Sequence, residues 1–243
     1  MKKKMYVLGV AALVAALLAM SGVAQSAMWV GAEIGGNFNP GVNMEVSALG
    51  LSASRNTAIY PSVIGGAIIG YDFVNAGFGA YAWPDWMKYF SFAMDLTYNR
   101  LTSSQATGIF QALAPNSKVN GYEIAWTFLF MAHYGFMPDS EVPGGRINPY
   151  IGVGPALVWT GMDLKVQSNG VSSGKIGANS MNVGLVVEPG IRWMCFKNVS
   201  VDTAMRYRYS QPSWSNDQAG FTISVGAKPL HQLAFLLRAN YHF

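Results

Sequence analysis

The chain has 243 residues, of which 51% are hydrophobic and only 12% are charged. Soluble domains usually carry about 25% charged residues, so this composition disfavours an ordinary soluble domain. The formal net charge is +4, but positions 2–4 supply three of the 16 basic residues; without them the balance is near +1 and gives no basis for a nucleic-acid surface. The single cysteine, Cys195, excludes an intramolecular disulfide and a cysteine metal cluster.

The N-terminal residues have the layout of a secretory signal peptide. Three lysines precede an apolar run over residues 5–24, and small residues follow up to position 27. Small residues at −3 and −1 favour cleavage after Ala24 or Ser26, whereas cleavage after Ala27 would place Gln25 at −3. An uncleaved anchor helix is the alternative. We expect residues 1–27 to be a cleaved leader and the mature chain to be exported.

The rest of the chain predicts strands rather than membrane helices. No further run of 18 apolar residues occurs, and in lipid only helices or closed barrels pair all their backbone polar groups. Segments of about 9–11 residues with alternating hydrophobicity are expected of barrel strands. Eight such segments occur, at residues 28–38, 62–73, 90–99, 122–134, 150–159, 181–193, 199–209 and 232–243. The prediction is an all-β fold, an eight-stranded antiparallel up-and-down transmembrane barrel over residues 28–243.

Charged residues inside these segments test that prediction. In 181–193, for example, Val183 and Leu185 share one face while Glu188 and Arg192 share the other. A charge facing lipid near the bilayer midplane costs about 2–4 kcal/mol, so charges should face the interior. Ten charges take the polar face and form an expected barrel-interior charge network: Glu33, Asp72, Asp95, Glu123, Glu188, Arg192, Asp202, Arg206, Arg208 and Arg238. Arg100 breaks the alternation, at a predicted strand end where it can reach water.

A soluble sandwich or lipocalin-like barrel is the alternative fold, and it would turn the apolar faces inward. Aromatic residues at the ends of the apolar faces, such as Tyr98, Trp193 and Tyr241, favour the membrane barrel, because outer-membrane barrels carry two interfacial aromatic girdles. The connections also alternate in length. The long set is about 39–61, 102–120, 161–180 and 210–230; the shorter set is about 74–88, 136–146 and 194–198. With both termini periplasmic, the long set faces outward, although 74–88 is longer than a usual periplasmic turn.

Three short motifs carry a family resemblance. The chain ends in Leu-Arg-Ala-Asn-Tyr-His-Phe over 237–243, and Gly-Tyr-Asp-Phe occurs at 70–73 and Pro-Tyr-Ile-Gly-Val-Gly at 149–154. The chain resembles the small eight-stranded outer-membrane β-barrel family of OmpA-type and OmpX-type barrels. The resemblance implies an outer-membrane location, contact with outer-membrane lipid and lipopolysaccharide, and an assembly signal at Tyr241 and Phe243 that the barrel-assembly machinery reads. No peptidoglycan-binding domain is expected, since the sequence stops at Phe243.

The interior charges are the first candidate for function. A polar core that fills the lumen is one interpretation, because eight strands leave a space that side chains can fill. A narrow gated pore for small solutes, in which arginines exchange carboxylate partners, is the other. The function expected is a non-enzymatic structural or surface-interaction barrel, whose outer loops are available to an extracellular ligand or host surface.

Two further groups of residues could point to a metal site or to an enzyme. The histidines His133, His242 and His231 are not at metal-ligand spacing, so no metal or cofactor is expected. A lipid-modifying hydrolase would need an activated serine, and a serine-rich group near the last outer loop is the only candidate: Ser210, Ser213, Ser215, Asp217 and His231. No local motif orders that group, so no catalytic residue is assigned.

Overall fold

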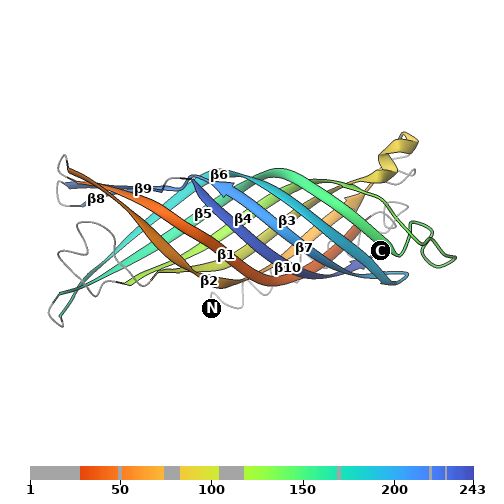
Figure 1. Cartoon of the computed structure of the whole chain (residues 1–243), viewed down its shortest axis with the longest axis horizontal. Helices are drawn as coiled ribbons and strands as arrows, with labels where there is room; N and C mark the ends of the chain where they lie inside the picture. Colours follow the sequence, from red (N-terminus) through yellow and green to blue (C-terminus); the bar gives the residue numbers. More distant parts are fainter. Residues whose placement is uncertain are drawn as a thin grey trace, which may run out of the picture.

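A computed structural model describes residues 28–48, 51–73, 83–103, 118–168, 171–218, 221–227 and 229–243. Eight strands form one closed antiparallel barrel (Figure 1). The barrel strands are β1 (Met28–Ala48), β2 (Leu51–Asp72), β3 (Phe90–Ser103), β4 (Lys118–His133), β5 (Ile147–Ser168), β6 (Val171–Phe196), β7 (Val199–Ser210) and β10 (Leu230–His242). Each pairs with the next, and β10 pairs with β1 from Trp29↔His242 to Phe38↔Leu233, which closes the sheet. The predicted fold is confirmed.

The outer connections differ from the prediction. The ranges 39–61 and 161–180 are mostly strand, since β1 and β2 pair out to Ala48↔Leu51, and β5 and β6 pair out to Ser168↔Val171. Within 210–230, β8 (Ser213–Gln218) and β9 (Phe221–Ala227) form a hairpin, and β9 also pairs with β1. Only the lipid-embedded part of a strand needs apolar alternation, so hydrophobicity cannot mark the part that continues into water. Most of the remaining connection, 104–117, lies outside the described residues.

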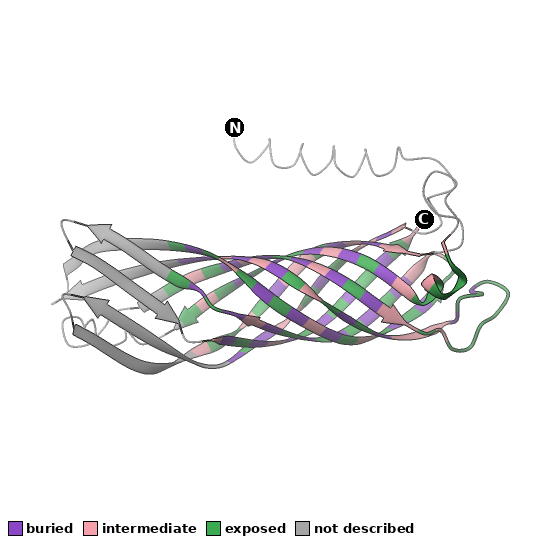
Figure 2. Ribbon diagram, turned by 90° about the horizontal axis from the view of Figure 1, so that it is seen from above, coloured by how far each residue is buried: buried purple, intermediate pink, exposed green. Residues whose placement is uncertain are grey.

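Side chains alternate between the lumen and the outer surface along the described part of each strand (Figure 2). β7 shows this most regularly, with every second residue buried from Ser200 to Ser210. On β6, Val183 is 68% exposed and Leu185 is 55% exposed, whereas Glu188 is fully buried. Apolar side chains therefore cover the outside and polar ones fill the inside, which is the reverse of a soluble barrel. A barrel with this exterior is a transmembrane barrel of the outer-membrane type.

Two glycines make room for large aromatic side chains inside the barrel. Trp29 pairs with Gly70 across β1 and β2, and a Cβ on Gly70 would overlap the Trp29 ring. Tyr150 pairs with Gly190 across β5 and β6, and a Cβ there would overlap the Tyr150 ring. Both aromatic side chains are buried. Each ring therefore packs closely against the neighbouring strand at its glycine.

The end where β1 begins and β10 finishes carries the shorter connections. A 3-10 helix, η3 (Asp85–Tyr89), precedes β3, and a turn joins β4 to β5. β2 ends at Asp72 and β3 begins at Phe90, so the predicted boundaries of the 74–88 connection agree within one residue. Among the described residues no helix is long and apolar enough to cross a bilayer.

The turn over residues 134–146 is held by charged side chains. The Asp139 carboxylate accepts hydrogen bonds from the backbone N–H groups of Glu141 (3.0 Å) and Val142 (2.8 Å), and it pairs with Arg146. The Val142 hydrogen bond first, and then the Arg146 guanidinium, lower the pKa of Asp139 below its usual range. Gly145 has a φ of 98°, which L side chains rarely adopt. The turn is therefore a fixed structure at the mouth of the barrel.

Candidate functional site

The ten charges expected inside the barrel all lie on its inner face. Nine are buried, and Asp72 is partly exposed at the end that carries the short connections. They fall into three layers along the barrel axis, named here the outer, central and periplasmic layers after the expected orientation with both termini in the periplasm. In each layer at least one side chain bonds to a strand on the opposite wall.

The central layer contains two arginines and three carboxylates. Arg238 on β10 donates from Nε to Glu33 (2.5 Å) and from Nη1 and Nη2 to Glu188 (2.5 and 2.8 Å). Arg206 on β7 donates to Glu188 (2.6 Å) and to Asp95. Since β3 and β7 face each other across the eight-strand barrel, the Arg206–Asp95 pair spans the lumen.

Register and a neighbouring tyrosine position this layer. Glu33 and Arg238 are directly opposite each other on β1 and β10, which places the carboxylate beside the guanidinium. The Tyr150 hydroxyl accepts from Arg238 (2.9 Å) and donates to Glu188 (3.3 Å). Ion pairs in a dry interior overcome their desolvation cost only with such additional hydrogen bonds. The layer is therefore a connected network rather than a set of separate pairs.

The outer layer is built around Glu123 on β4. Arg208 donates to one carboxylate oxygen of Glu123 (2.7 Å), and Gln232 on β10 donates to the other (3.0 Å). Arg208 also donates to the Thr97 hydroxyl (3.3 Å). β4 and β10 lie on opposite walls, so the Gln232–Glu123 hydrogen bond is the second connection across the lumen.

The periplasmic layer is built around Arg192 on β6. Its guanidinium lies 3.3 Å from the Asp202 carboxylate and 3.7 Å from that of Asp72 on the opposite strand β2. The Trp29 ring lies beneath it, 4.4 Å from ring centroid to guanidinium carbon, and the indole N–H donates to Asp72 (3.0 Å). A cation over an indole face is attracted by the ring quadrupole. This is the third connection between opposite walls.

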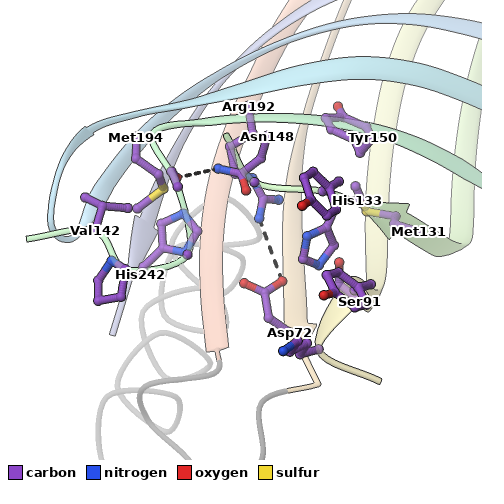
Figure 3. A pocket seen from close by; sticks show the side chains of 17 residues that line it. Asp72, Ser91, Met131, His133, Val142, Asn148, Tyr150, Arg192, Met194 and His242 are labelled. Carbon is purple, nitrogen blue, oxygen red and sulfur yellow. Dashed lines mark hydrogen bonds and ion pairs between the residues drawn. The ribbon is translucent and has the colours of Figure 1, made fainter. Parts of the chain in front are cut away.

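A vestibule of about 440 Å³ lies on the periplasmic side of this layer (Figure 3). Arg192, Asp72, His133 and His242 line it, and residues 142–145 of the turn complete the lining. The vestibule was not anticipated, because it depends on how the turn folds over the mouth.

The other predicted residues are distributed around the barrel. His133 and His242 line the vestibule, whereas His231 lies on the outside, where its Nδ1 is 2.6 Å from the Tyr207 hydroxyl. No group of three or more His, Cys, Asp or Glu side chains within the described residues is placed to hold a metal ion. Tyr241 faces outward and packs edge-on against Phe243, with ring centroids 5.3 Å apart.

The serine-rich group does not assemble in the way that a hydrolase requires. Ser210 is fully buried on the inner face, while His231 is exposed on the outer face beside Tyr207. Ser213 is exposed. The side chains of Ser215 and Asp217 lie outside the described residues.

Sequence reasoning missed the uncharged members of the network. Trp29, Tyr150, Thr97 and Gln232 all bond to the interior charges. Tyr150, Thr97 and Gln232 were already on the inward face of the predicted alternation. For the two aromatics, a glycine at the paired position on the next strand is the signal that could have identified them.

Comparison with solved structures finds barrels of the same kind. The outer membrane protein OprG from Pseudomonas aeruginosa matches with a TM-score of 0.57 at 14% identity, over 90% of this chain and 97% of that one. Neisserial surface protein A matches at 0.45 and 17% identity, over 89% and 97%. AlkL, solved in DMPC lipid bilayers, matches at 0.41 and 17%, over 93% and 94%. No protein-family model matches the chain, and no curated protein matches its sequence. The OprG likeness concerns the fold, which is that of small eight-stranded outer-membrane barrels.

Proposed function

We propose that this protein is a non-enzymatic outer-membrane barrel whose lumen is closed and whose outer hairpins present an interaction surface. The observation that carries the proposal is the set of three connections between opposite walls: Arg206–Asp95, Gln232–Glu123 and Arg192–Asp72. A solute that crossed the lumen would have to break all three.

Energetics support a permanently closed lumen. Breaking a buried pair by removing one partner costs about 3–5 kcal/mol, because the other charge is left uncompensated. Arg238 contacts two carboxylates and a tyrosine hydroxyl at once, so its displacement would expose several groups together. The layers therefore suit a rigid anchor better than an open channel.

The outer hairpins supply the surface. A strand needs only about 9–11 residues to cross a membrane, yet β5 has 22 residues and β6 has 26. Their extra length extends the sheet beyond the apolar band on the side away from the vestibule (Figure 1). Binding residues concentrate in such projections on rigid scaffolds. We propose an extracellular ligand or host surface as their partner, and lipopolysaccharide around the barrel wall.

Biogenesis follows from the same proposal. Residues 1–27 lie outside the described residues, and we assign them as a cleaved leader. Tyr241 and Phe243 are proposed as the signal for the barrel-assembly machinery. Changing both to Ala should lower the amount of folded barrel in the outer membrane, as judged by its resistance to mild detergent on gels before boiling.

Planar-bilayer recording tests the closed lumen. The wild-type protein should show no discrete conductance, whereas a variant that combines Arg192→Ala, Arg206→Ala and Gln232→Ala should, since it lacks all three connections across the lumen. Arg146→Ala, at the exposed turn, is the matched control and should stay silent. Steady conductance from the wild type would contradict the proposal.

A gated pore is the second candidate, and one observation favours it. Arg206 and Arg238 together face three carboxylates, and each arginine lies within 4.0 Å of all three, so pairings could be exchanged. Voltage-dependent openings in the wild type that Arg206→Ala makes permanent would favour this function over the closed barrel.

The interaction role has a separate test. Replacing residues 164–176 with a short turn would shorten the β5–β6 hairpin at the pair Asp163↔Gly177 and leave the barrel intact. Cells with the shortened protein should lose adhesion, or binding of an added ligand, while detergent resistance is retained. Unchanged adhesion and unchanged ligand binding together would remove the surface role.

A further inference from the structure

The lipid-facing surface of the barrel has a shallow apolar groove next to the vestibule. A shallow groove of about 630 Å³ runs over the outer face of β3, β4 and β5, where Phe90, Ala132 and Ile151 form one cross-strand row. Ala132 is the small residue between two large ones, so the row is hollow at its centre. All three side chains are apolar, and Ile151 is 51% exposed. The groove therefore suits a hydrocarbon chain that lies against the barrel.

The groove and the vestibule share part of their lining. Tyr89, His133, Tyr134 and Tyr150 border both. Tyr150 and His133 belong to the inner face, whereas Tyr134 is 55% exposed at the outer surface. An apolar site on the lipid side thus adjoins a polar site inside the mouth, at the level of the periplasmic leaflet.

The polar site has unpaired hydrogen-bonding groups. Among the described residues, Arg192 Nη2, Ser91 Oγ and His133 Nε2 are buried without a hydrogen-bond partner. Buried polar atoms are almost always paired, so such a group is a candidate ligand contact. The Arg192 guanidinium points into the vestibule, and Ser91 and His133 face it as well (Figure 3).

The formal charge of the vestibule favours an anion. Lys88 stands at its rim and forms no ion pair within the described part of the chain. Arg192 is paired with Asp72 in the lining and with Asp202 behind it, so Lys88 is the cation of the lining that is left for an anion. Charge-assisted hydrogen bonds from a guanidinium and an ammonium are the usual means of holding a phosphate group. The volume of about 440 Å³ also lies within the range of small-ligand pockets.

We propose that the vestibule and the groove together bind one anionic phospholipid of the periplasmic leaflet. Its phosphate lies between Lys88 and Arg192, with Ser91 as an additional donor, and one acyl chain lies along Ala132 between Phe90 and Ile151. The site requires a molecule with a phosphate head and an apolar tail, because the two halves adjoin and differ in polarity. It is independent of whether the lumen conducts.

Native mass spectrometry of the mature barrel with equimolar phosphatidylglycerol and phosphatidylcholine tests the proposal. The wild type should retain phosphatidylglycerol about five-fold better, the size expected for one basic residue beside an anionic lipid. Lys88→Glu should remove that preference, whereas Lys197→Glu, at the same end in the β6–β7 turn, should keep it. Equal retention of the two lipids by the wild type, or equal loss in both lysine variants, would overturn the proposal.

A second pair of variants tests the acyl chain. Ala132→Trp fills the groove without changing the vestibule and should lower phosphatidylglycerol retention. Ala239→Trp, on the lipid-facing side of β10, is the control and should not. Glycerol 3-phosphate that displaces phosphatidylglycerol at equal concentration, together with an unaffected Ala132→Trp variant, would identify a free-anion site and overturn the lipid assignment. Heat-dependent gel mobility confirms that each variant is folded.

Discussion

Arg238 and Arg146 each lie between two carboxylates, and the two sites differ in what surrounds them. Arg238 pairs with Glu33 and Glu188, and all three side chains are inaccessible to solvent. Arg146 pairs with Asp139 and Glu141 in the turn that contributes to the lining of the vestibule, and those side chains are 30%, 37% and 66% exposed. In the lumen, water cannot replace a lost partner, while at the turn it can. The same ion pairs therefore block the lumen at Arg238, whereas at Arg146 they only stabilise the local conformation of a turn.

Replacing Arg238 with Met should produce the largest effect. Glu33 would lose the guanidinium that donates to it and Glu188 would lose one of its two arginine partners, at a cost of about 3–5 kcal/mol in the free energy of unfolding. Urea titration of the folded barrel in lipid vesicles, followed by tryptophan fluorescence, measures the change. Arg146→Met is the control, and its midpoint should stay close to that of the wild type. Similar losses in the two variants would show that burial does not distinguish these sites.

Gly190→Ala should have the next largest effect. Its new methyl group would overlap the Tyr150 ring, and overpacking of this kind costs about 1–3 kcal/mol. Gly144→Ala in the turn is the matched control, since no atom lies within 4 Å of the position of its Cβ. The same urea titration should separate the two substitutions. A neutral Gly190→Ala would mean that Tyr150 can move without disturbing the network.

Tyr150→Phe sharpens the comparison further, because it removes one hydroxyl and leaves the ring. Hydrogen bonds to charged groups contribute about 1.5–3 kcal/mol, and this hydroxyl has two charged partners, Arg238 and Glu188. We expect a loss near the lower figure, because Arg238 and Glu188 remain bonded to each other. Tyr134→Phe, on the outer surface, is the control. If Tyr150→Phe left the free energy of unfolding unchanged, the hydroxyl would not contribute to the stability of the network.

The local sequence predicts the strands and the face on which each charge lies, but it does not predict which charges pair with one another. Alternation identified all eight strands and placed Glu188 and Arg192 on the inner face, because lipid penalises a misdirected charge strongly. It could not place the ends of β5 and β6, since a ladder in water is held by the backbone and carries no hydrophobic signal. Nor could it choose partners, because Arg206 on β7 and Asp95 on β3 meet only through the closure of the barrel. The vestibule depends on the turn over residues 134–146. The conformation of that turn could not be predicted, because the sequence does not show that Arg146 pairs with Asp139.

The smallest expected effect is the pH response of that turn. The pKa of Asp139 is lowered from 3.8 in the folded protein, so its contribution is fully present above that value and is lost as the pH falls through the lower folded pKa. The backbone N–H of Val142 is the first cause and Arg146 the second, so Arg146→Gln should raise the midpoint only part of the way towards 3.8. The amide resonance of Val142, followed by NMR between pH 5 and pH 2 in detergent micelles, reports the transition. A wild-type midpoint at or above 3.8 would contradict the hydrogen bond from Val142 to Asp139. It would mean that this hydrogen bond does not hold the turn in its conformation.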